Sequence, residues 1–197
     1  MIKYDIITFG NYNWRVLKVE GDRALIISEN IIELRWYNHE FVDITWAECG
    51  LRNYLNNEFY SKFSQDEQSK IFAVTNKNPD NPWFKTTGGY DTIDSIFLLS
   101  LEEVCEHFGS STGSLVNKGS QNWLIDDRNN GERQAKFNNV YHWWRLRSPG
   151  YYSKTAASIN SNGNVYVRGN GVYGRPRDGG GVRPALWLKL EEEIFHS

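Results

Sequence analysis

Two stiff, apolar runs dominate the C-terminal half of the chain: Trp143-Trp144-Arg145-Leu146-Arg147-Ser148-Pro149-Gly150 and Gly181-Val182-Arg183-Pro184-Ala185-Leu186-Trp187-Leu188. Between them, hydrophobic residues recur at every second position, as Ala157, Ile159, Val165, Val167 and Val172. Since side chains alternate between the two faces of a strand, this spacing predicts short strands with one buried face. Asn162-Gly163 predicts a hairpin turn, and Gly169-Asn170-Gly171 predicts a second turn. We therefore predict an antiparallel meander whose other face is displayed.

The displayed face and its loops are rich in Tyr, Arg, Asn and Ser. Tyr gives a large rigid contact area, Arg gives planar donors, and Asn and Ser give adaptable hydrogen bonds, as in antibody binding surfaces. A merely solvated sheet face is the alternative, but it tends towards Lys, Glu and Thr. Asn164 shares the displayed face and Lys154 lies in its loop. We predict a ligand-binding surface that consists of Tyr151, Tyr152, Ser153, Ser158, Asn160, Tyr166, Arg168, Asn170, Tyr173, Arg175, Arg177 and Asp178.

Length and composition predict a single domain over residues 1–197. The 197 residues, of which 40% are hydrophobic, are enough to bury one core. N-terminal strands and helices are expected at 5–99 and the displayed meander at 143–188. The net charge of -2 and the pI near 6.1 argue against a nucleic-acid partner. No secretory signal or membrane-spanning run is present, so we expect a cytoplasmic chain without a membrane partner, with delivery to a surface by another route left open.

The rest of the chain carries local signals for strands and loops. Residues 5–29 predict three short strands, separated by turns at Gly10-Asn11 and Gly21-Asp22. Phe97-Leu98-Leu99 predicts a short buried strand. Residues 76–91 are rich in Asn, Pro and Gly and predict an ordered loop, because Trp83 and Phe84 need a hydrophobic environment. Residues 109–139 are polar and are predicted to be irregular.

Three helices are predicted from capping residues and apolar spacing. Thr45 is expected to cap a helix over residues 46–59. Two capping boxes, Ser64 with Glu67 and Ser100 with Glu103, predict helices that end near residues 72 and 108.

No motif points to catalysis, a metal or a cofactor. Cys49 and Cys105 are expected to be buried, without disulfide or zinc-ligand spacing, and the four His residues show no metal spacing. Residues 126–131 begin like a calcium loop but lack its final Glu ligand. Residues 169–174 match a dinucleotide fingerprint without the helix that it requires. Arg147 and Arg183 are interpreted as structural residues that bond backbone carbonyls or a carboxylate.

A set of frame residues extends over nearly the whole chain. In the C-terminal half it comprises Trp144, Leu146 to Gly150, Ala156-Ala157, Gly163-Asn164-Val165, Gly169, Val172 and Gly181 to Leu188. Earlier segments are Ile7-Thr8-Phe9-Gly10, Trp14-Arg15-Val16-Leu17, Leu51-Arg52-Asn53-Tyr54-Leu55-Asn56 and residues 92–100. This frame resembles the bacterial and phage DUF6273 domains. That family is related to the C-type-lectin-like fold of the formylglycine-generating enzymes, and some members are variable proteins of diversity-generating retroelements.

The resemblance implies an α+β, C-type-lectin-like fold, with short antiparallel strands, two or three helices and much irregular loop. It also implies a non-enzymatic binding protein whose residues 151–178 are rewritten by adenine-directed mutagenesis. The expected partner is a protein or carbohydrate ligand, with no cofactor, and homo-oligomerisation is left open. One alternative is an enzyme related to the formylglycine-generating oxidases, which use a cysteine pair. Another is a carbohydrate-binding lectin-like module.

Overall fold

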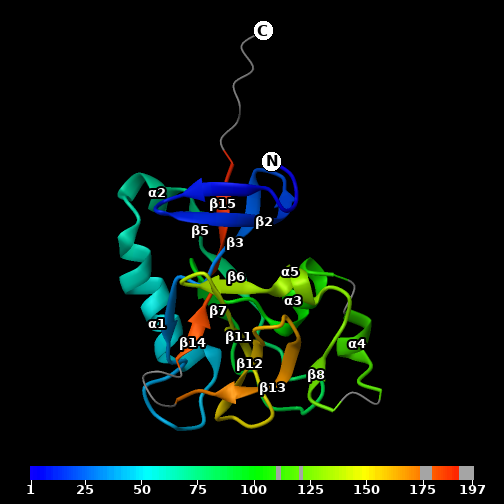
Figure 1. Cartoon of the computed structure of the whole chain (residues 1–197). Coiled ribbons are helices and arrows are strands. Elements are labelled where there is room, and N and C mark those ends of the chain that lie inside the picture. The colour runs from blue at the N-terminus through cyan, green and yellow to red at the C-terminus, as the bar shows by residue number, and fades with distance from the viewer. Residues whose placement is uncertain (110–111, 120–121, 174–178, 191–197) are drawn as a thin grey trace.

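Two sheets organise the protein, and the last described strands pass from one sheet to the other (Figure 1). The computed structural model describes residues 1–109, 112–119, 122–173 and 179–190. In Figure 1 the five-stranded sheet lies at the upper end and the six-stranded sheet fills the lower part, with short helices at the sides. The protein is therefore a mixed α+β structure that consists mostly of short strands, as the sequence predicts.

The upper sheet contains the three predicted N-terminal strands. Its order is β1 (Ile6–Phe9), β2 (Tyr12–Glu20), β3 (Arg23–Ser28), β15 (Ala185–Lys189) and β5 (Ile71–Phe72). The turns that separate the first three strands contain Gly10 and Gly21, with φ of 58° and 60°. Glycine adopts this left-handed region without strain, so both turns form as predicted.

The lower sheet contains the predicted meander in part. Its order is β4 (Glu33–Arg35), β14 (Gly180–Val182), β11 (Trp144–Pro149), β12 (Thr155–Ile159), β13 (Val165–Gly171) and β8 (Leu124–Ile125). Strands β11, β12 and β13 form antiparallel pairs, and the Asn162-Gly163 hairpin connects the last two. The closing run departs from the prediction, because β14 lies parallel to β11 and β15 pairs with β3 and β5 in the upper sheet.

The second predicted turn is wrong, because Gly169-Asn170-Gly171 continues β13. The pairing of β12 with β13 shifts register between Ala156 and Ser158, which marks a bulge in the opposite strand. Gly169 has φ of 76°, and a Cβ there would lie 2.2 Å from the Ala156 carbonyl oxygen. The bulge therefore requires a glycine. The Gly169-Asn170-Gly171 sequence resembles that of a turn, which is why the pattern predicts one.

The described α-helical segments are short. They are α1 (Gly50–Tyr54), α2 (Gln65–Ser69), α3 (Leu101–His107), α4 (Thr112–Val116) and α5 (Asn130–Arg133). Both predicted capping boxes form, at α2 and at α3. The first predicted helix forms as successive pieces, which are the 3-10 turn η1 (Trp46–Glu48), α1, the π-helical η2 (Leu55–Phe59) and the 3-10 turn η3 (Tyr60–Lys62). Cys49 and not Thr45 caps α1, with its sulfur accepting from the Arg52 amide. Helix α2 ends at Ser69, since Ile71 and Phe72 pair with β15. None of the helices in the described ranges is long and apolar enough to cross a membrane.

Two further hairpins complete the described strands, and Phe97 forms only an isolated bridge to Ala185. The hairpins pair β6 (Val74–Asn76) with β7 (Thr92–Asp94), and β9 (Ala135–Phe137) with β10 (Val140–His142). The segment 109–139 that was predicted to be irregular thus contains α4, α5, β8 and part of this second hairpin.

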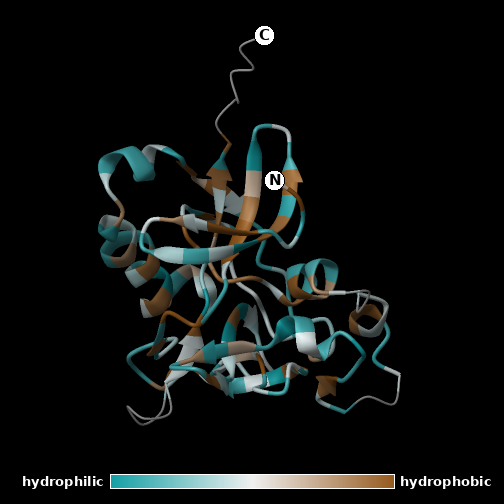
Figure 2. Ribbon diagram, turned by 45° about the horizontal axis from the view of Figure 1, so that its top comes forward, coloured by the Kyte–Doolittle hydropathy of each residue, from teal (hydrophilic) through white to brown (hydrophobic). Residues whose placement is uncertain are grey.

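One cluster of buried hydrophobic residues connects the two sheets. It includes Trp14 of β2 and Trp144 of β11, both without exposed surface, together with Cys49 and Cys105, which are free and buried as predicted. Figure 2 shows hydrophobic residues along the strands of the upper sheet and a largely hydrophilic α2 at the edge of the molecule. Arg183, between β14 and β15, donates from Nε to the Ser28 carbonyl at 2.8 Å. The structural interpretation of Arg183 is therefore confirmed.

Candidate functional site

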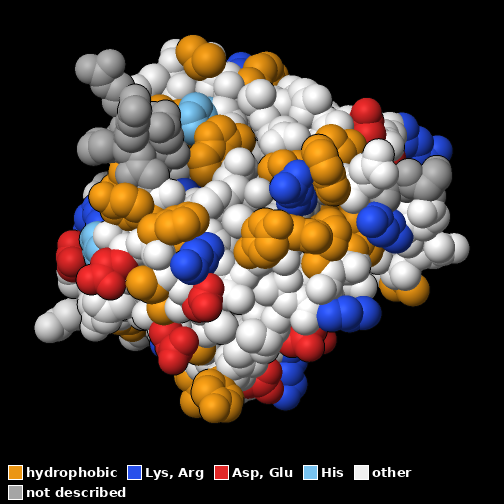
Figure 3. All heavy atoms as spheres, turned by 90° about the horizontal axis from the view of Figure 1, so that it is seen from below, with side chains coloured by type: hydrophobic (Ala, Val, Ile, Leu, Met, Phe, Trp, Pro, Cys, Tyr) orange, Lys and Arg blue, Asp and Glu red, His pale blue; other side chains and the backbone are white. Residues whose placement is uncertain are grey.

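Three loops meet beside the lower sheet and enclose a groove of about 640 Å³. They are the loop after β4, the loop between β6 and β7, and the loop between β11 and β12. Figure 3 shows this lower end of the molecule, where hydrophobic side chains alternate with Lys and Arg. We call this cavity the aromatic groove. It is lined by Phe41, Asp43, Lys85, Thr86, Thr87, Tyr151, Tyr152, Ser153, Lys154 and Thr155.

A tight turn after β11 presents Tyr151 and Tyr152 to the groove. The Gly150 amide donates to the Thr155 carbonyl at 2.8 Å, and the Tyr152 amide donates to Thr155 Oγ1 at 3.0 Å. A Cβ at Gly150 would lie 2.3 Å from the Arg168 carbonyl oxygen. That same carbonyl accepts from the Tyr151 amide at 2.8 Å. The turn is thus held against β13, and only glycine fits at its first position.

A buried asparagine holds the opposite wall of the groove. Asn81, without exposed surface, donates from Nδ2 to the Pro149 carbonyl at 2.8 Å and to the Val167 carbonyl at 3.1 Å. Its Oδ1 accepts from the Trp83 and Phe84 amides at 2.9 and 3.2 Å. One side chain therefore joins the loop between β6 and β7 to the ends of β11 and β13.

Arg168 of β13 lies between two aromatic rings beside the groove. Its guanidinium carbon is 4.3 Å from the centroid of the Trp123 ring and 5.4 Å from that of Tyr151. The Tyr151 ring meets Phe84 and Tyr152 edge-on, with centroids 4.7 and 4.3 Å apart. Cations over aromatic faces are attracted to the ring quadrupole. The stacking therefore restrains a guanidinium that donates no hydrogen bond to any described residue.

The predicted site residues divide into groups. Tyr151, Tyr152 and Ser153 line the groove, and Arg168 lies next to it. Tyr173 is exposed but stacks on Trp36, with centroids 5.2 Å apart, outside the groove lining. Tyr166 is half-buried in β13.

Asn160 is remote from the groove. It follows β12, whereas Tyr151 precedes it, and that five-residue strand separates the two by roughly 17 Å at 3.3 to 3.4 Å per residue. Arg175, Arg177 and Asp178 lie outside the described residues.

The prediction that Ser158 and Asn164 are displayed is wrong. Ser158 has no exposed surface and Asn164 is 4% exposed. The register sets Ser158 opposite Arg145, which is buried and donates to the Arg35 and Gly171 carbonyls at 3.2 Å each. The face of the sheet that carries Ser158 and Arg145 is therefore buried, whereas the sequence predicts a displayed face. Ser158 Oγ accepts from the half-buried Asn170 at 2.8 Å, so the pair links β12 to β13 internally.

Several residues of the site were missed by the sequence analysis. Phe41, Lys85 and Thr86 line the groove, and Trp123 covers Arg168. The signal available in the sequence is a Trp within a polar segment. In the structure, Trp123 keeps 51% of its surface exposed. The other three come from loops that reach the groove only through tertiary contacts, such as the 2.9 Å hydrogen bond from Thr86 Oγ1 to the Tyr151 carbonyl.

Comparison with known proteins identifies the family of this chain. The model of a domain of unknown function, DUF6273, matches residues 21–190. The chain belongs to the DUF6273 family. No curated protein and no solved structure matches it. The match covers both sheets except β1 and β2, so the groove belongs to the DUF6273 domain itself.

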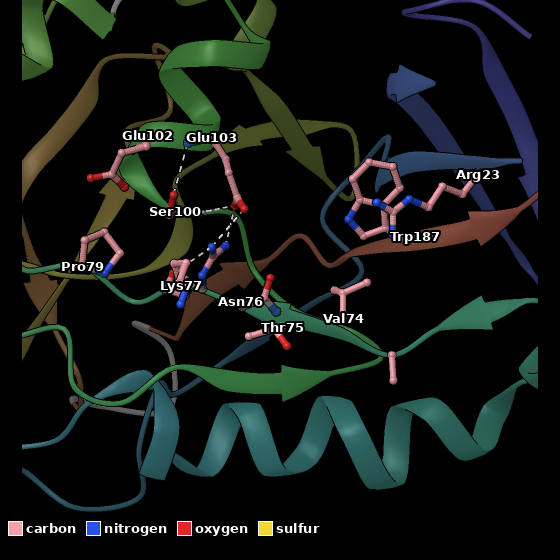
Figure 4. Close-up of a pocket in the computed structure, with 12 residues that line it drawn as sticks. Arg23, Val74, Thr75, Asn76, Lys77, Pro79, Ser100, Glu102, Glu103 and Trp187 are labelled. Carbon is pink, nitrogen blue, oxygen red and sulfur yellow. Dashed lines mark hydrogen bonds and ion pairs between the residues drawn. The ribbon is translucent and has the colours of Figure 1, made fainter. Parts of the chain in front are cut away.

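The DUF6273 domain has a second cavity of about 620 Å³, between the two sheets (Figure 4). At one end Arg23 stacks on Trp187, with its guanidinium carbon 4.5 Å from the ring centroid. At the other end Glu103 bonds the Ser100 amide and forms an ion pair with Arg147. Arg147 also donates to the Leu98 carbonyl at 2.8 Å. These groups satisfy one another and fix the fold, which confirms the structural interpretation of Arg147.

Burial sets the acid–base behaviour of the two cysteines of the DUF6273 domain. Burial raises the pKa of the Cys49 and Cys105 thiols to about 12 each. A thiol is nucleophilic as the thiolate, so both side chains are unreactive at neutral pH. Within the ranges that the structure describes, no group of three or more His, Cys, Asp or Glu side chains is placed to hold a metal ion. The aromatic groove, with Arg168, is the best candidate for the functional site.

Proposed function

We propose that this DUF6273 domain is a non-enzymatic ligand-binding protein, and that the aromatic groove with Arg168 is its contact surface. The observation that carries the proposal is a guanidinium restrained by Trp123 and Tyr151 but without a hydrogen-bond partner among the described residues. Tyr, Trp and Arg supply most of the energy in protein interfaces. An arrangement that fixes their side chains before binding also lowers the entropy cost of association.

The proposal includes a C-type-lectin-like fold and a sequence-variable surface, as in the variable proteins of diversity-generating retroelements. Support comes from the resemblance of the frame and from the mixture of short antiparallel strands, short helices and loops. Tyr151 and Tyr152 are 39% and 59% exposed, so replacing them leaves the core intact. The variability is tested in the genome: a near-copy of the codons for residues 151–178 beside a reverse-transcriptase gene is expected.

The buried cysteines favour binding over the oxidase alternative. That chemistry requires accessible thiols, whereas Cys49 has 1% of its surface exposed and Cys105 has none. Desolvation raises both pKa values, which is opposite to the shift in reactive cysteines. The proposed function includes both a protein and a carbohydrate as the ligand.

The binding surface is tested with two matched double variants. Tyr152→Ala/Arg168→Ala removes an exposed Tyr and a stacked Arg at the groove, and Tyr141→Ala/Arg23→Ala removes the same chemistry elsewhere. The free energy of unfolding of both variants should differ from that of the wild type by no more than about 0.5 kcal/mol per substitution. Ligands selected on glycan arrays and from displayed peptides should lose about 2 kcal/mol or more of affinity only with the groove variant. Equal binding by both variants would place the binding surface elsewhere and refute the proposal.

A further inference from the structure

The groove gathers positive charge on a chain whose net charge is -2. Lys85 and Lys154 line it, Arg168 lies beside Tyr151, and Lys118 Nζ is 5.4 Å from the Phe84 ring centroid. Among the described lining residues, Asp43 is the single acid. The surface is therefore cationic and aromatic, against the overall charge of the chain.

None of these four cations forms an ion pair with a described residue. Elsewhere arginines are commonly neutralised, as Arg15 is by Glu29 at 2.6 Å and Arg52 by Asp94 at 2.6 Å. Lys85 Nζ instead donates to the Pro82 carbonyl, and Lys154 Nζ lies 5.3 Å from the Phe41 ring centroid. A cluster of like charges without partners raises the energy of the free protein, and an anionic partner relieves it.

Arg168 defines the anion that fits best. The guanidinium carbon of Arg168 lies over the Trp123 ring and within 5.4 Å of the Tyr151 ring centroid, and its N–H groups donate to no described residue. A guanidinium in this state binds a carboxylate through two parallel hydrogen bonds. The ring of Tyr151 beside Arg168 and the rings of Phe41 and Tyr152 in the groove offer apolar contacts, which a phosphate backbone does not need.

We infer that the partner of the groove is an acidic segment of another protein, in which Asp or Glu residues alternate with apolar ones. One carboxylate binds Arg168, neighbouring carboxylates lie near Lys85 and Lys154, and an apolar side chain packs on the Tyr151 and Tyr152 rings. This inference rests on the proposed function and specifies the chemistry of its ligand.

The test is a selection of random peptides displayed on phage against the wild-type chain, with Tyr152→Ala/Arg168→Ala as the counter-selection. The peptides enriched on the wild type should carry an excess of Asp and Glu together with apolar residues. A synthetic copy with each Glu replaced by Gln and each Asp by Asn should bind about tenfold more weakly or worse. Raising the NaCl concentration from about 0.15 M to about 1 M should lower the affinity for the acidic peptide and leave the affinity for its neutral copy almost unchanged.

The outcomes separate the two claims. Enriched peptides of neutral or positive charge that still fail on the groove variant would overturn the acidic partner and leave the binding surface intact. Peptides that bind the groove variant as well as the wild type, or no enrichment at all, would overturn both. Binding of an oligonucleotide of equal charge as tightly as the acidic peptide would show that charge alone is recognised, and would also overturn the inference.

Discussion

Arg147 and Arg168 belong to strands of the same sheet, yet their donors are used in opposite ways. Arg147 of β11 is 4% exposed, and its donors bond the Leu98 and Lys77 carbonyls and the Glu103 carboxylate. Arg168 of β13 is half-buried between two rings and bonds no described residue through its guanidinium. The function of an arginine in this sheet therefore depends on the acceptors that surround it. An internal Arg stabilises the fold, and a stacked Arg without acceptors is available to a ligand.

The largest expected effect is the loss of the Arg147 donors. Arg147→Met should destabilise the fold by about 3 to 5 kcal/mol, because Glu103 loses its ion-pair partner and buried carbonyls lose their donors. Urea denaturation measures this. Lys154→Met is the control, since Lys154 forms no ion pair with a described residue, and it should change the stability by less than about 0.5 kcal/mol. Equal stability of the two variants would contradict the structural function of Arg147.

The stack of Arg23 on Trp187 provides a smaller effect. Trp187 of β15 is half-buried under Arg23, so Trp187→Ala should cost about 2 kcal/mol, less than the 3 to 5 kcal/mol typical of a fully buried aromatic. Thermal unfolding of Trp187→Ala beside Trp123→Ala measures the difference, because Trp123 is 51% exposed and its loss should cost less. A larger loss for Trp123→Ala would mean that the Arg168 stack supports the fold.

Local signals were sufficient where the partners are close in sequence. The capping boxes at Ser64 and Ser100 each join residues three positions apart, and both form as predicted. The Asn162-Gly163 turn is equally local. The end of α2 was wrong because Ile71 pairs with Leu188, a contact across most of the chain that no local pattern contains.

The sequence indicates which residue types form the candidate site but not the tertiary contacts that assemble it. Tyr151 and Tyr152 are predicted because a Tyr-rich loop differs from an ordinary solvated one, and Arg168 because it alternates with Val165 and Val167 along β13. Ser158 was misplaced because the alternation of a strand identifies two faces but does not say what covers the second, here Arg145. The opposite wall of the groove depends on the hydrogen bonds of Asn81 to two distant carbonyls, which the sequence does not reveal.

The smallest expected effect on stability is the sharpest test of the comparison between Arg147 and Arg168. Arg168→Lys keeps the positive charge but loses the planar fork and part of the stacking on Trp123. Its stability should stay within about 0.5 kcal/mol of the wild type, whereas the affinity for acidic peptides should fall about tenfold. The salt dependence should remain close to that of the wild type, because the charge is retained, while Arg168→Gln should lose part of it. Arg23→Lys, at the arginine that stacks on Trp187, should change neither quantity measurably. If Arg168→Lys binds as tightly as the wild type, the groove recognises charge at long range, and the stacked guanidinium has no specific part in it.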